Sequence, residues 1–319
     1  MKSIGSTYDK LYSGKGPKIC KHRRGQLELR HLRYFIKAAE LQNFTRAAEA
    51  LYVSQPTLSV QIQQLEEELG AELFSRSGRS IKLTETGQVF LKRAKEAIRS
   101  LEIGTQEVDA LNSILRGHLH LGSMPLYGSR YVSGWICRFN SQYPGVEINY
   151  KSLASEDLEE EVLAGRMDLG FTIVPPQHGE LQYHELFKDE IVCVVSEGHE
   201  AADKKKLTVK DLEALPLVLP SERISATRLL GNYCEEHGIE LGASMRFDDG
   251  HALLSVLKGS RFATFLPRGA VQNNDALVVM SMPPPGIPVS VGLVWTNLSP
   301  STKAFLELVK ALTKDGLKA

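Results

Sequence analysis

Apolar residues recur at helical spacing in two neighbouring stretches between residues 43 and 69. In the second stretch they fall at steps of four, three and four, on one face of a helix: Leu58, Ile62, Leu65 and Leu69. In the first stretch the apolar face is shorter and consists of Ala47, Ala48 and Leu51. Tyr52 and Val53 lie between the two stretches and are too few to form an element of their own. The pattern therefore predicts two short helices joined by a tight turn.

Polar residues mark the starts of both helices. Asn43 and Ser54 are good N-caps, because their side-chain oxygens can accept a hydrogen bond from an otherwise unpaired backbone N–H. Pro56 falls in the first turn of the second helix, where no helical hydrogen bond is lost. Two helices joined in this way predict a helix-turn-helix, whose second helix lies in the DNA major groove with its N-terminal residues against base edges.

The start of the second helix carries the side chains that we expect to read DNA. Glutamine can pair with adenine at two atoms, serine and threonine can pair with either base, and a threonine methyl can touch the thymine methyl. An ordinary amphipathic helix with a solvated polar face is the alternative interpretation. The candidate DNA-binding residues of this helix are Ser54, Gln55, Pro56, Thr57 and Ser59.

A second element is expected between Leu73 and Leu83. Ser77-Gly78 is a turn signal, and the residues just before Leu83 alternate apolar and basic, as in a half-buried strand. The pattern predicts a small β-hairpin, called the wing below, which can reach phosphates or a narrow minor groove. A solvated hairpin without DNA contact is the alternative. The cations of the wing are Arg76, Arg79 and Lys82.

A long helix is expected from Thr84, which can cap it, to about Arg116. We expect this linker helix to dimerise, so that each copy reads one half-site of DNA. The alternative is a helix that packs on its own domain. Its apolar residues follow a spacing close to a heptad, which needs a partner helix, and they are Phe90, Ala94, Ala97, Leu101, Val108, Leu111 and Leu115.

From residue 117 onward, strands and helices alternate, which is typical of an α/β fold with a parallel sheet. Helices are expected from Ser129 to Gln142 and from Ser155, as its cap, to Ala164. A second unit begins near residue 190, and the chain is expected to return to the first unit near 265–268. Two linked α/β lobes predict a ligand cleft between them, at the carboxyl ends of the strands.

The candidate ligand residues of this cleft follow from the expected strand ends. Hydroxyl groups and helix N-termini suit a carboxylate or another small anion. Taken singly, each residue is also explained by a structural role. The candidates are Ser123, Met124, Pro125, Ser129, Thr172, Ser221, Thr227, Gly250 and His251, with Pro220, Arg223 and Pro267 nearby.

The charge of the chain is unevenly distributed, although 38 Lys and Arg balance 38 Asp and Glu. Residues 1–26 hold seven basic residues and one acidic residue, residues 27–116 hold twelve of each, and residues 117–319 hold nineteen basic and twenty-five acidic residues. These segments therefore carry +6, zero and −6. An acidic second half discourages DNA from wrapping non-specifically around it.

Signals of other protein classes are weak. The four cysteines have no CxxC spacing, so free thiols in a reducing cytoplasm are expected. The sequence contains no hydrolase elbow or metalloprotease motif, so we expect no enzyme. Cys234 and His237 could form half a zinc site, but no second pair follows, and no metal or cofactor is expected. No apolar run is long enough to span a membrane.

The first 26 residues are basic and rich in Ser and Gly, without the apolar segment of a signal peptide. A disordered arm that attracts phosphate is one interpretation. The other is that translation begins at Leu27, through an alternative start codon, since members of the family named next begin near that position.

Several ordered motifs resemble LysR-type transcriptional regulators. They include Leu29-Arg30-His31-Leu32-Arg33-Tyr34-Phe35, Leu65-Glu66-Glu67-Glu68-Leu69-Gly70, Leu83-Thr84-Glu85-Thr86-Gly87, Gln142-Tyr143-Pro144-Gly145 and Phe265-Leu266-Pro267. The resemblance covers nearly everything after residue 26. Residues 232–235 add a faint likeness to regulators of cyanate or related small-anion metabolism. Many relatives carry Arg at the position of Val60 and Ser or Thr at that of Met124.

The resemblance implies a multi-domain fold: a winged helix-turn-helix rich in α-helix, a long linker helix and a two-lobed α/β effector domain like the periplasmic binding proteins. The ranges are a basic disordered extension at 1–26, the DNA-binding domain at 27–87, the dimerising linker at 88–116 and the effector domain at 117–319. Lobe I takes about 117–189 and 268–319, and lobe II about 190–267.

The function implied by the resemblance is sequence-specific DNA binding, modulated by a small inducer held between the lobes. Double-stranded operator DNA, the inducer, RNA polymerase and further copies of the chain, as a homodimer or homotetramer in the cytoplasm, are the implied partners. A ligand receptor without regulatory DNA binding is the rival class, because two-lobed α/β clefts also serve periplasmic receptors.

Overall fold

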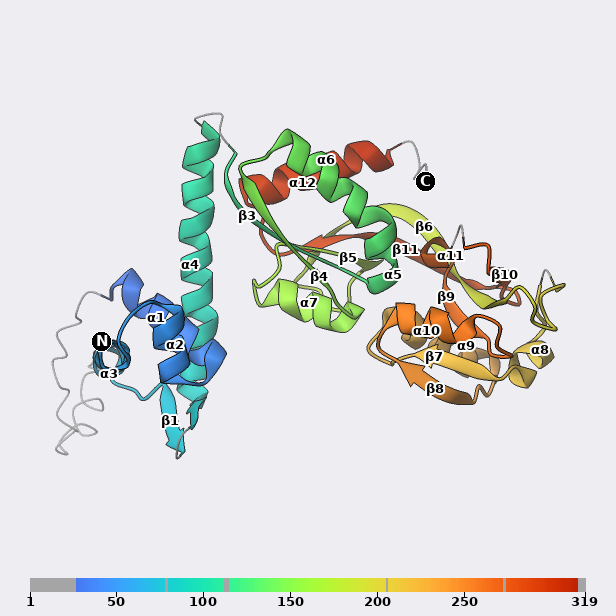
Figure 1. Cartoon of the computed structure of the whole chain (residues 1–319), viewed down its shortest axis with the longest axis horizontal. Coiled ribbons are helices and arrows are strands. Elements are labelled where there is room, and N and C mark those ends of the chain that lie inside the picture. The colour runs from blue at the N-terminus through green and yellow to red at the C-terminus, as the bar shows by residue number, and fades with distance from the viewer. Residues whose placement is uncertain (1–26, 78–79, 112–114, 205, 272–273, 315–319) are drawn as a thin grey trace, which may run out of the picture. The chain divides into compact units, whose positions relative to one another are not determined.

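The computed structural model describes residues 27–77, 80–111, 115–204, 206–271 and 274–314 (Figure 1). The proposed start at Leu27 and the basic arm concern residues 1–26, which lie outside the described residues. The chain forms two compact units, and the boundary between them along the sequence falls between Ile98 and Arg99.

The first unit is a three-helix domain with a hairpin. Its described elements are α1 Leu29–Leu41, α2 Phe44–Ala50, α3 Gln55–Leu69, β1 Phe74–Ser77 and β2 Ser80–Leu83. The expected caps are confirmed, since Asn43 Oδ1 accepts from Arg46 N over 3.1 Å and Ser54 Oγ accepts from Thr57 N over 3.3 Å. Leu58, Ile62 and Leu65 are buried as expected, whereas Leu69 is 37% exposed at the end of the stripe.

The linker helix α4 runs from Glu85 to Leu111. Thr84 Oγ1 accepts from Gly87 N over 2.9 Å, which supports the helix start. The expected end at about Arg116 is wrong, because α4 ends at Leu111 and neither Leu115 nor Arg116 is helical. The apolar residues expected to face a partner helix do not share one environment. Phe90 and Ala94 pack in the core of the first unit, while Leu101 is 54% exposed.

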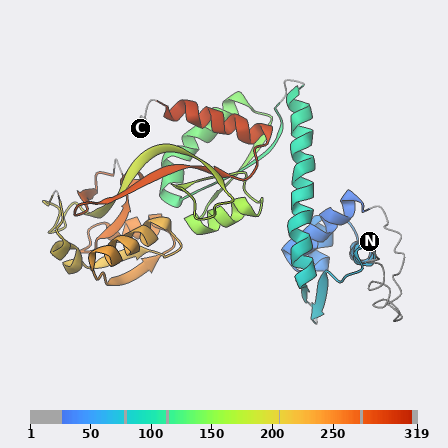
Figure 2. The same cartoon turned by 180° about the vertical axis from the view of Figure 1, so that it is seen from behind.

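The second unit is built on one mixed sheet in the order β10-β6-β11-β5-β3-β4, with β9 paired to β6. These strands are β3 Gly117–Ser123, β4 Val146–Ser152, β5 Leu169–Val174, β6 Gln182–Ser196, β9 Thr264–Pro267, β10 Leu277–Ser281 and β11 Ile287–Trp295. Figure 2 shows the long strands β6 and β11 passing from one lobe to the other. They are therefore the crossover between the lobes.

The first lobe covers strands β3, β4 and β5 with helices on both faces. Its helices are α5 Pro125–Tyr127, the π-helical turn η1 Gly128–Val132, α6 Ser133–Gln142, α7 Ser155–Leu163 and α12 Pro300–Thr313. The expected start at Ser129 is wrong, because Pro125 already opens a helical turn. Ser155 is the first helical residue rather than the cap, which is Ala154.

The second lobe holds a parallel pair of strands, β7 and β8, flanked by helices. The bounds are α8 Val209–Ala214, β7 Leu217–Pro220, α9 Ser225–His237, β8 Ala243–Phe247, α10 Gly250–Leu257 and α11 Arg268–Val271. We expected the chain to return from the second lobe to the first near residues 265–268, but it returns later. Strands β9 and β10 both pair with the Val192–Val194 part of β6, and the chain returns along β11.

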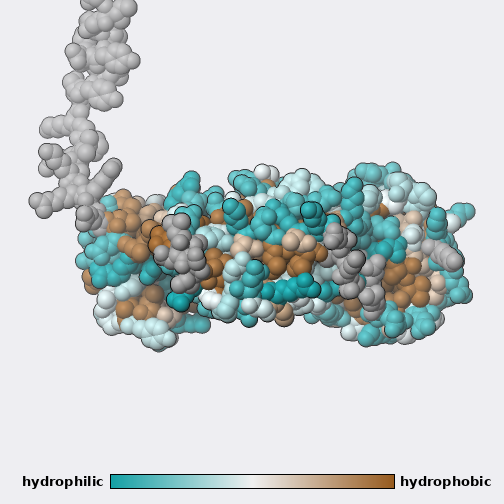
Figure 3. All heavy atoms as spheres, turned by 90° about the horizontal axis from the view of Figure 1, so that it is seen from above, coloured by the Kyte–Doolittle hydropathy of each residue, from teal (hydrophilic) through white to brown (hydrophobic). Residues whose placement is uncertain are grey.

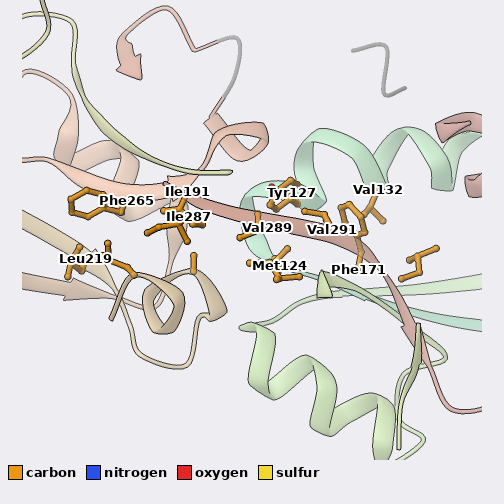
Figure 4. Close-up of a cluster of buried hydrophobic side chains, with 14 of the residues drawn as sticks. Met124, Tyr127, Val132, Phe171, Ile191, Leu219, Phe265, Ile287, Val289 and Val291 are labelled. Atoms are coloured by element: carbon orange, nitrogen blue, oxygen red, sulfur yellow. The ribbon is translucent and has the colours of Figure 1, made fainter. Parts of the chain in front are cut away.

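A hydrophobic core follows the crossover strands through both lobes (Figure 4). Tyr127 and Phe171 lie on the side of the first lobe, with ring centroids 5.7 Å apart, while Ile191 and Phe265 lie on the side of the second. Because the same strands carry core residues of both lobes, a change in the lobe angle bends β6 and β11 themselves.

Candidate functional site

The N-terminal turn of α3 presents the expected polar residues to solvent. Ser54, Gln55, Pro56 and Thr57 are exposed, and Ser59 is half-buried. Gln55 Nε2 donates to Ser59 Oγ over 2.8 Å, and the hydroxyls of Ser54 and Thr57 are 2.7 Å apart. These bonds orient a compact polar surface made of side-chain amide and hydroxyl groups, which can donate to and accept from base edges.

Val60 is the exposed apolar residue beside that polar surface. It is 51% exposed, one residue after Ser59. Its methyl groups can touch a thymine methyl but cannot donate a hydrogen bond. The surface therefore offers no cation at this position of α3.

The wing is partly described. Strands β1 and β2 pair antiparallel, with Arg76 opposite Ile81 and Ser75 opposite Lys82. Lys82 is exposed and lies on the second strand. Arg79 lies outside the described residues, and of Arg76 the backbone alone is described. Their contacts with DNA thus stay predictions.

Tyr52, in the turn before α3, was not among the expected site residues. Its side chain is 97% exposed and its φ is +56°, in the left-handed region that few residues other than glycine adopt. The turn length alone could not reveal this, since the sequence offers no glycine or asparagine at that position. The turn displays an aromatic hydroxyl next to the helix cap Ser54.

In the first lobe, the structure brings Ser123 and Thr172 onto neighbouring strands, β3 and β5. Ser123 is fully buried, and its hydroxyl lies 2.7 Å from that of Tyr150 on β4. Thr172 is also fully buried, but its Oγ1 makes no hydrogen bond to any described residue. Tyr150 was missed at the sequence level, because only the register of β3 against β4 brings it to Ser123.

The other first-lobe candidates are less suited to hold a ligand by polar contact. Met124 is buried and its N–H donates to Phe171 O over 3.1 Å, while Pro125 opens α5. Ser129 is exposed, and its hydroxyl donates to Leu126 O over 3.0 Å within its own helical turn.

The second lobe contributes Ser221 and Thr227 near the end of β7. Ser221 Oγ is buried without a hydrogen-bond partner among the described residues, whereas Thr227 Oγ1 donates to Pro220 O over 3.3 Å. Gly250 is buried at the start of α10, and a Cβ there would stand 2.9 Å from Leu126 of the first lobe. His251 is exposed beside it.

The two lobes touch through the starts of α7 and α9. Ser225 N donates to Ser155 Oγ over 3.4 Å, and Glu156 N donates to Arg223 O over 3.4 Å. The Arg223 guanidinium also pairs with Asp157. The starts of α7 and α9 therefore contact each other across the lobe boundary.

Cys234 and His237 both lie on α9. His237 Nδ1 lies 2.8 Å from Tyr233 O, and its ring stacks on that of Tyr233. Burial raises the pKa of the Cys234 thiol. No cluster of three or more His, Cys, Asp and Glu that could hold a metal ion occurs among the described residues.

The described helices include none that is long and apolar enough to cross a membrane. Figure 3 shows one face of the molecule, on which hydrophilic residues surround smaller hydrophobic patches.

Two family models match the chain. The model described as "LysR substrate binding domain" matches residues 113–315, and the model described as "Bacterial regulatory helix-turn-helix protein, lysR family" matches residues 29–88. Together they account for both compact units.

Relatives of known sequence match along nearly the whole chain. The uncharacterized HTH-type transcriptional regulator YwbI of Bacillus subtilis is 29% identical over 297 residues, which cover 92% of this chain and 99% of that protein.

Solved structures match the fold. Full-length OxyR from Pseudomonas aeruginosa superposes with a TM-score of 0.72 at 21% identity, covering 91% of this chain and 95% of that one. CbnR complexed with its target DNA gives a TM-score of 0.63 at 24% identity, covering 89% and 99%. The likeness supports the fold of both units.

Proposed function

Because the chain belongs to the LysR family of transcriptional regulators, sequence-specific DNA-binding proteins with an effector-binding domain, we propose which of its residues read DNA and where its effector binds. The family is one of regulators rather than enzymes. The chain acts, in this proposal, by changing how it holds DNA and not by catalysis.

The proposed reading head is the start of α3. Gln55, Thr57 and Ser59 meet base edges, Ser54 and Pro56 set the helix start, and Arg76 and Arg79 of the wing contact the backbone or the minor groove. The observation that supports this is the Gln55–Ser59 hydrogen bond on an otherwise solvated face. It restricts the Gln55 amide before DNA arrives, which lowers the entropy lost on binding.

The proposed effector is a carboxylate or another small anion held between the lobes. Its main support is that each lobe contributes a buried hydroxyl near the lobe contacts that has no hydrogen-bond partner among the described residues, Thr172 Oγ1 in the first lobe and Ser221 Oγ in the second. Unpaired buried hydroxyls are costly, so an acceptor that reaches both is favoured. The start of α9, whose first turn holds no acidic residue, adds an N-terminal dipole that favours negative charge. Ser123, Met124, Pro125, Ser129, Thr227, Gly250 and His251 complete the proposed surroundings.

The proposed assembly is a homodimer through α4, paired into a homotetramer in the cytoplasm. An apolar side chain as exposed as Leu101, at 54%, on a helix of 27 residues supports a partner helix. A dimer places two reading heads on two half-sites. RNA polymerase is the further partner that such a regulator contacts at a promoter.

The proposed mechanism is a shift in the angle between the lobes. The two lobe angles are in equilibrium, and the effector shifts that equilibrium toward the angle that it binds more tightly. The size of the shift is limited by the difference between the effector's affinities for the two angles. Since β6 and β11 carry core residues of both lobes, the shift is transmitted through the crossover strands to the first lobe, which Arg99 of α4 contacts at Asp168.

Anion-dependent stabilisation tests the effector site. Thermal unfolding of the full chain is followed with acetate, succinate, cyanate and bicarbonate, for the wild type and for Thr172→Val. Thr264→Val is the matched control, because Thr264 on β9 is an equally buried threonine whose hydroxyl bonds to none of the described residues. We expect at least one anion to raise the midpoint in the wild type and the control but not in Thr172→Val. An equal rise in all three proteins, or none in the wild type, contradicts the proposal.

A further inference from the structure

A groove of about 800 Å³, which we call the junction groove, lies where the chain enters the sheet of the second unit. Its walls come from Leu115 and Arg116, which precede β3, from residues 142–145, which link α6 to β4, and from the first half of α12. This is the amino-terminal edge of β3 and β4, whereas Ser123 of the proposed effector site ends β3. The volume lies in the range of small-molecule sites, about 300–1,000 Å³.

One face of α12, which packs against α6, forms a wall of the junction groove (Figure 1). Its lining residues recur at helical spacing and are Pro300, Lys303, Ala304 and Glu307. The exposed Lys303 therefore shares this face with the half-buried Pro300 and Ala304. Glu307 lies at the far end of the face, where its Oε1 accepts from Lys310 Nζ over 3.0 Å.

Arg116 supplies a second cation on the opposite wall. A Cβ on Gly145 would stand 3.1 Å from Arg116 Cγ, so the arginine stem lies across the bare backbone of that glycine. Neither Arg116 nor Lys303 forms an ion pair with any described residue. The charged residues that line the groove are two cations and the carboxylate of Glu307, which sum to +1. The groove therefore favours an anion.

The apolar part of the groove is held in place by the core. Leu115 and Tyr143 are half-buried and pack against the core of the second unit. The Tyr143 ring lies 4.9 Å from that of Phe139, which in turn lies 5.3 Å from the Phe305 ring of α12, measured between centroids. An apolar wall that is already formed costs little ordering when a ligand covers it and removes it from water.

We infer that the junction groove binds a carboxylate with an apolar body several carbons long. The carboxylate lies on Arg116 and Lys303, and the body covers Leu115, Tyr143 and Ala304. A charge-assisted contact at one end and apolar burial along the rest select an amphipathic anion over a small inorganic one. This site is separate from the effector site proposed between the lobes.

The groove adjoins the contacts that hold the linker helix to the second unit. The Ser301 hydroxyl lies 2.9 Å from Gln106 Oε1 of α4 and 3.2 Å from His118 O of β3. A ligand that bridges α12 and Arg116 therefore braces the junction at which α4 joins this unit.

Equilibrium dialysis of the full chain against sodium octanoate, an eight-carbon carboxylate, tests the site. We expect saturable binding of one octanoate per chain. Lys303→Glu reverses one charge of the groove and should weaken binding about tenfold or more, as for loss of a charge-assisted contact. Lys210→Glu is the matched control, at an exposed lysine near the start of α8, and should bind like the wild type. Arg116→Gln removes the other cation, from a different element, and should weaken binding in the same direction.

Sodium butanoate tests the role of the apolar body. It carries the same carboxylate on a chain shorter by four methylenes, and each buried methylene contributes about fourfold in affinity. We therefore expect butanoate to bind the wild type at least tenfold more weakly than octanoate. Equal affinities would show that the carboxylate alone is recognised, contrary to the inference.

Thr172→Val separates the junction groove from the site between the lobes. Octanoate binding should survive Thr172→Val with unchanged affinity. Binding that is lost in Thr172→Val but kept in Lys303→Glu assigns octanoate to the lobe boundary and overturns the inference. Unsaturable binding to the wild type, or equal affinity of wild type and Lys303→Glu, also overturns it, while the anion test of the effector site is unaffected.

Discussion

Gln55 Nε2 donates a hydrogen bond to Ser59 Oγ over 2.8 Å, one helical turn apart on the solvent-facing side of α3. The bond occupies one of the two amide N–H donors of Gln55 and leaves its carbonyl oxygen and the second N–H for another partner. An adenine edge needs one donor and one acceptor. The pair is therefore held in a position that suits base recognition.

Replacing Gln55 tests this recognition directly. Gln55→Ala should weaken specific binding by about 1–3 kcal/mol, the range for one good bidentate base contact. Binding to random DNA should change little, because that affinity comes from phosphate contacts. Fluorescence anisotropy with operator and random duplexes measures both. Gln88→Ala, at an exposed glutamine on α4, is the control. Equal losses on both duplexes would refute a base contact.

Arg99 should hold α4 to the effector unit. Its guanidinium donates to Asp168 Oδ1 over 2.7 Å and to Gly165 O over 2.6 Å, and both charged side chains are mostly buried. Arg99→Gln leaves the Asp168 charge without its counter-ion, so we expect a loss of about 2 kcal/mol in the free energy of unfolding of this unit.

Tryptophan fluorescence during urea unfolding measures the effect of Arg99→Gln, because Trp135 and Trp295 both belong to the effector unit. Arg246→Gln is the control, since its ion pair with Glu222 lies in the same unit, is 47% exposed on the arginine side and contributes little. A change in Arg99→Gln as small as that of the control would show that the contact does not stabilise the unit.

Thr172→Val should stabilise the effector-free protein. Valine keeps the shape of threonine and removes a buried hydroxyl that has no partner among the described residues, so we expect a gain of about 1 kcal/mol. Urea unfolding of the effector unit gives the value. A loss of stability would mean that Thr172 Oγ1 is satisfied in solution, for example by water.

Glu159 should make stability depend on pH. It is 1% exposed on α7, and its carboxylate accepts from Gln177 N over 2.9 Å and from His178 N over 3.4 Å. Burial raises the pKa of the Glu159 carboxyl above its ordinary value of 4.5 and outweighs the two backbone bonds, which lower it. The stabilisation is therefore complete below the unfolded-state pKa and is lost as pH rises through the folded-state pKa.

Glu159→Gln removes this titration. Relative to the wild type, the variant should gain stability as pH is raised from about 4 to about 7. Glu160→Gln, on the exposed side of the same helix, is the control. A stability difference between Glu159→Gln and wild type that stays constant over this range would rule out the effect of burial.

The helix-turn-helix was predictable because its signals are local. Asn43 and Ser54 cap their own helices, and Leu58, Ile62 and Leu65 are buried at helical spacing. Such signals need no information from distant parts of the chain. The same holds for the wing, where the sequence signals a turn at Ser77-Gly78 and β1 pairs antiparallel with β2.

The crossover strands were predictable only in part, since their length depends on distant partners. Strand β6 begins at Gln182, nine residues before its buried stretch starts at Ile191, because β11 pairs with the polar segment. The role of Ser155 was missed for a similar reason. Its hydroxyl accepts from Ser225 of the other lobe, and a tertiary contact of this kind leaves no periodicity in the sequence.

Binding of the full chain to the intergenic DNA upstream of its own gene tests the central claim most directly. Fluorescence anisotropy is measured at two salt concentrations, with and without excess random competitor DNA. The account predicts binding that resists the competitor at both salt concentrations, since base contacts through α3 add to the phosphate term. Binding that disappears with the competitor would leave only a sequence-independent charge effect and would contradict the assignment of α3 as the reading head at that site.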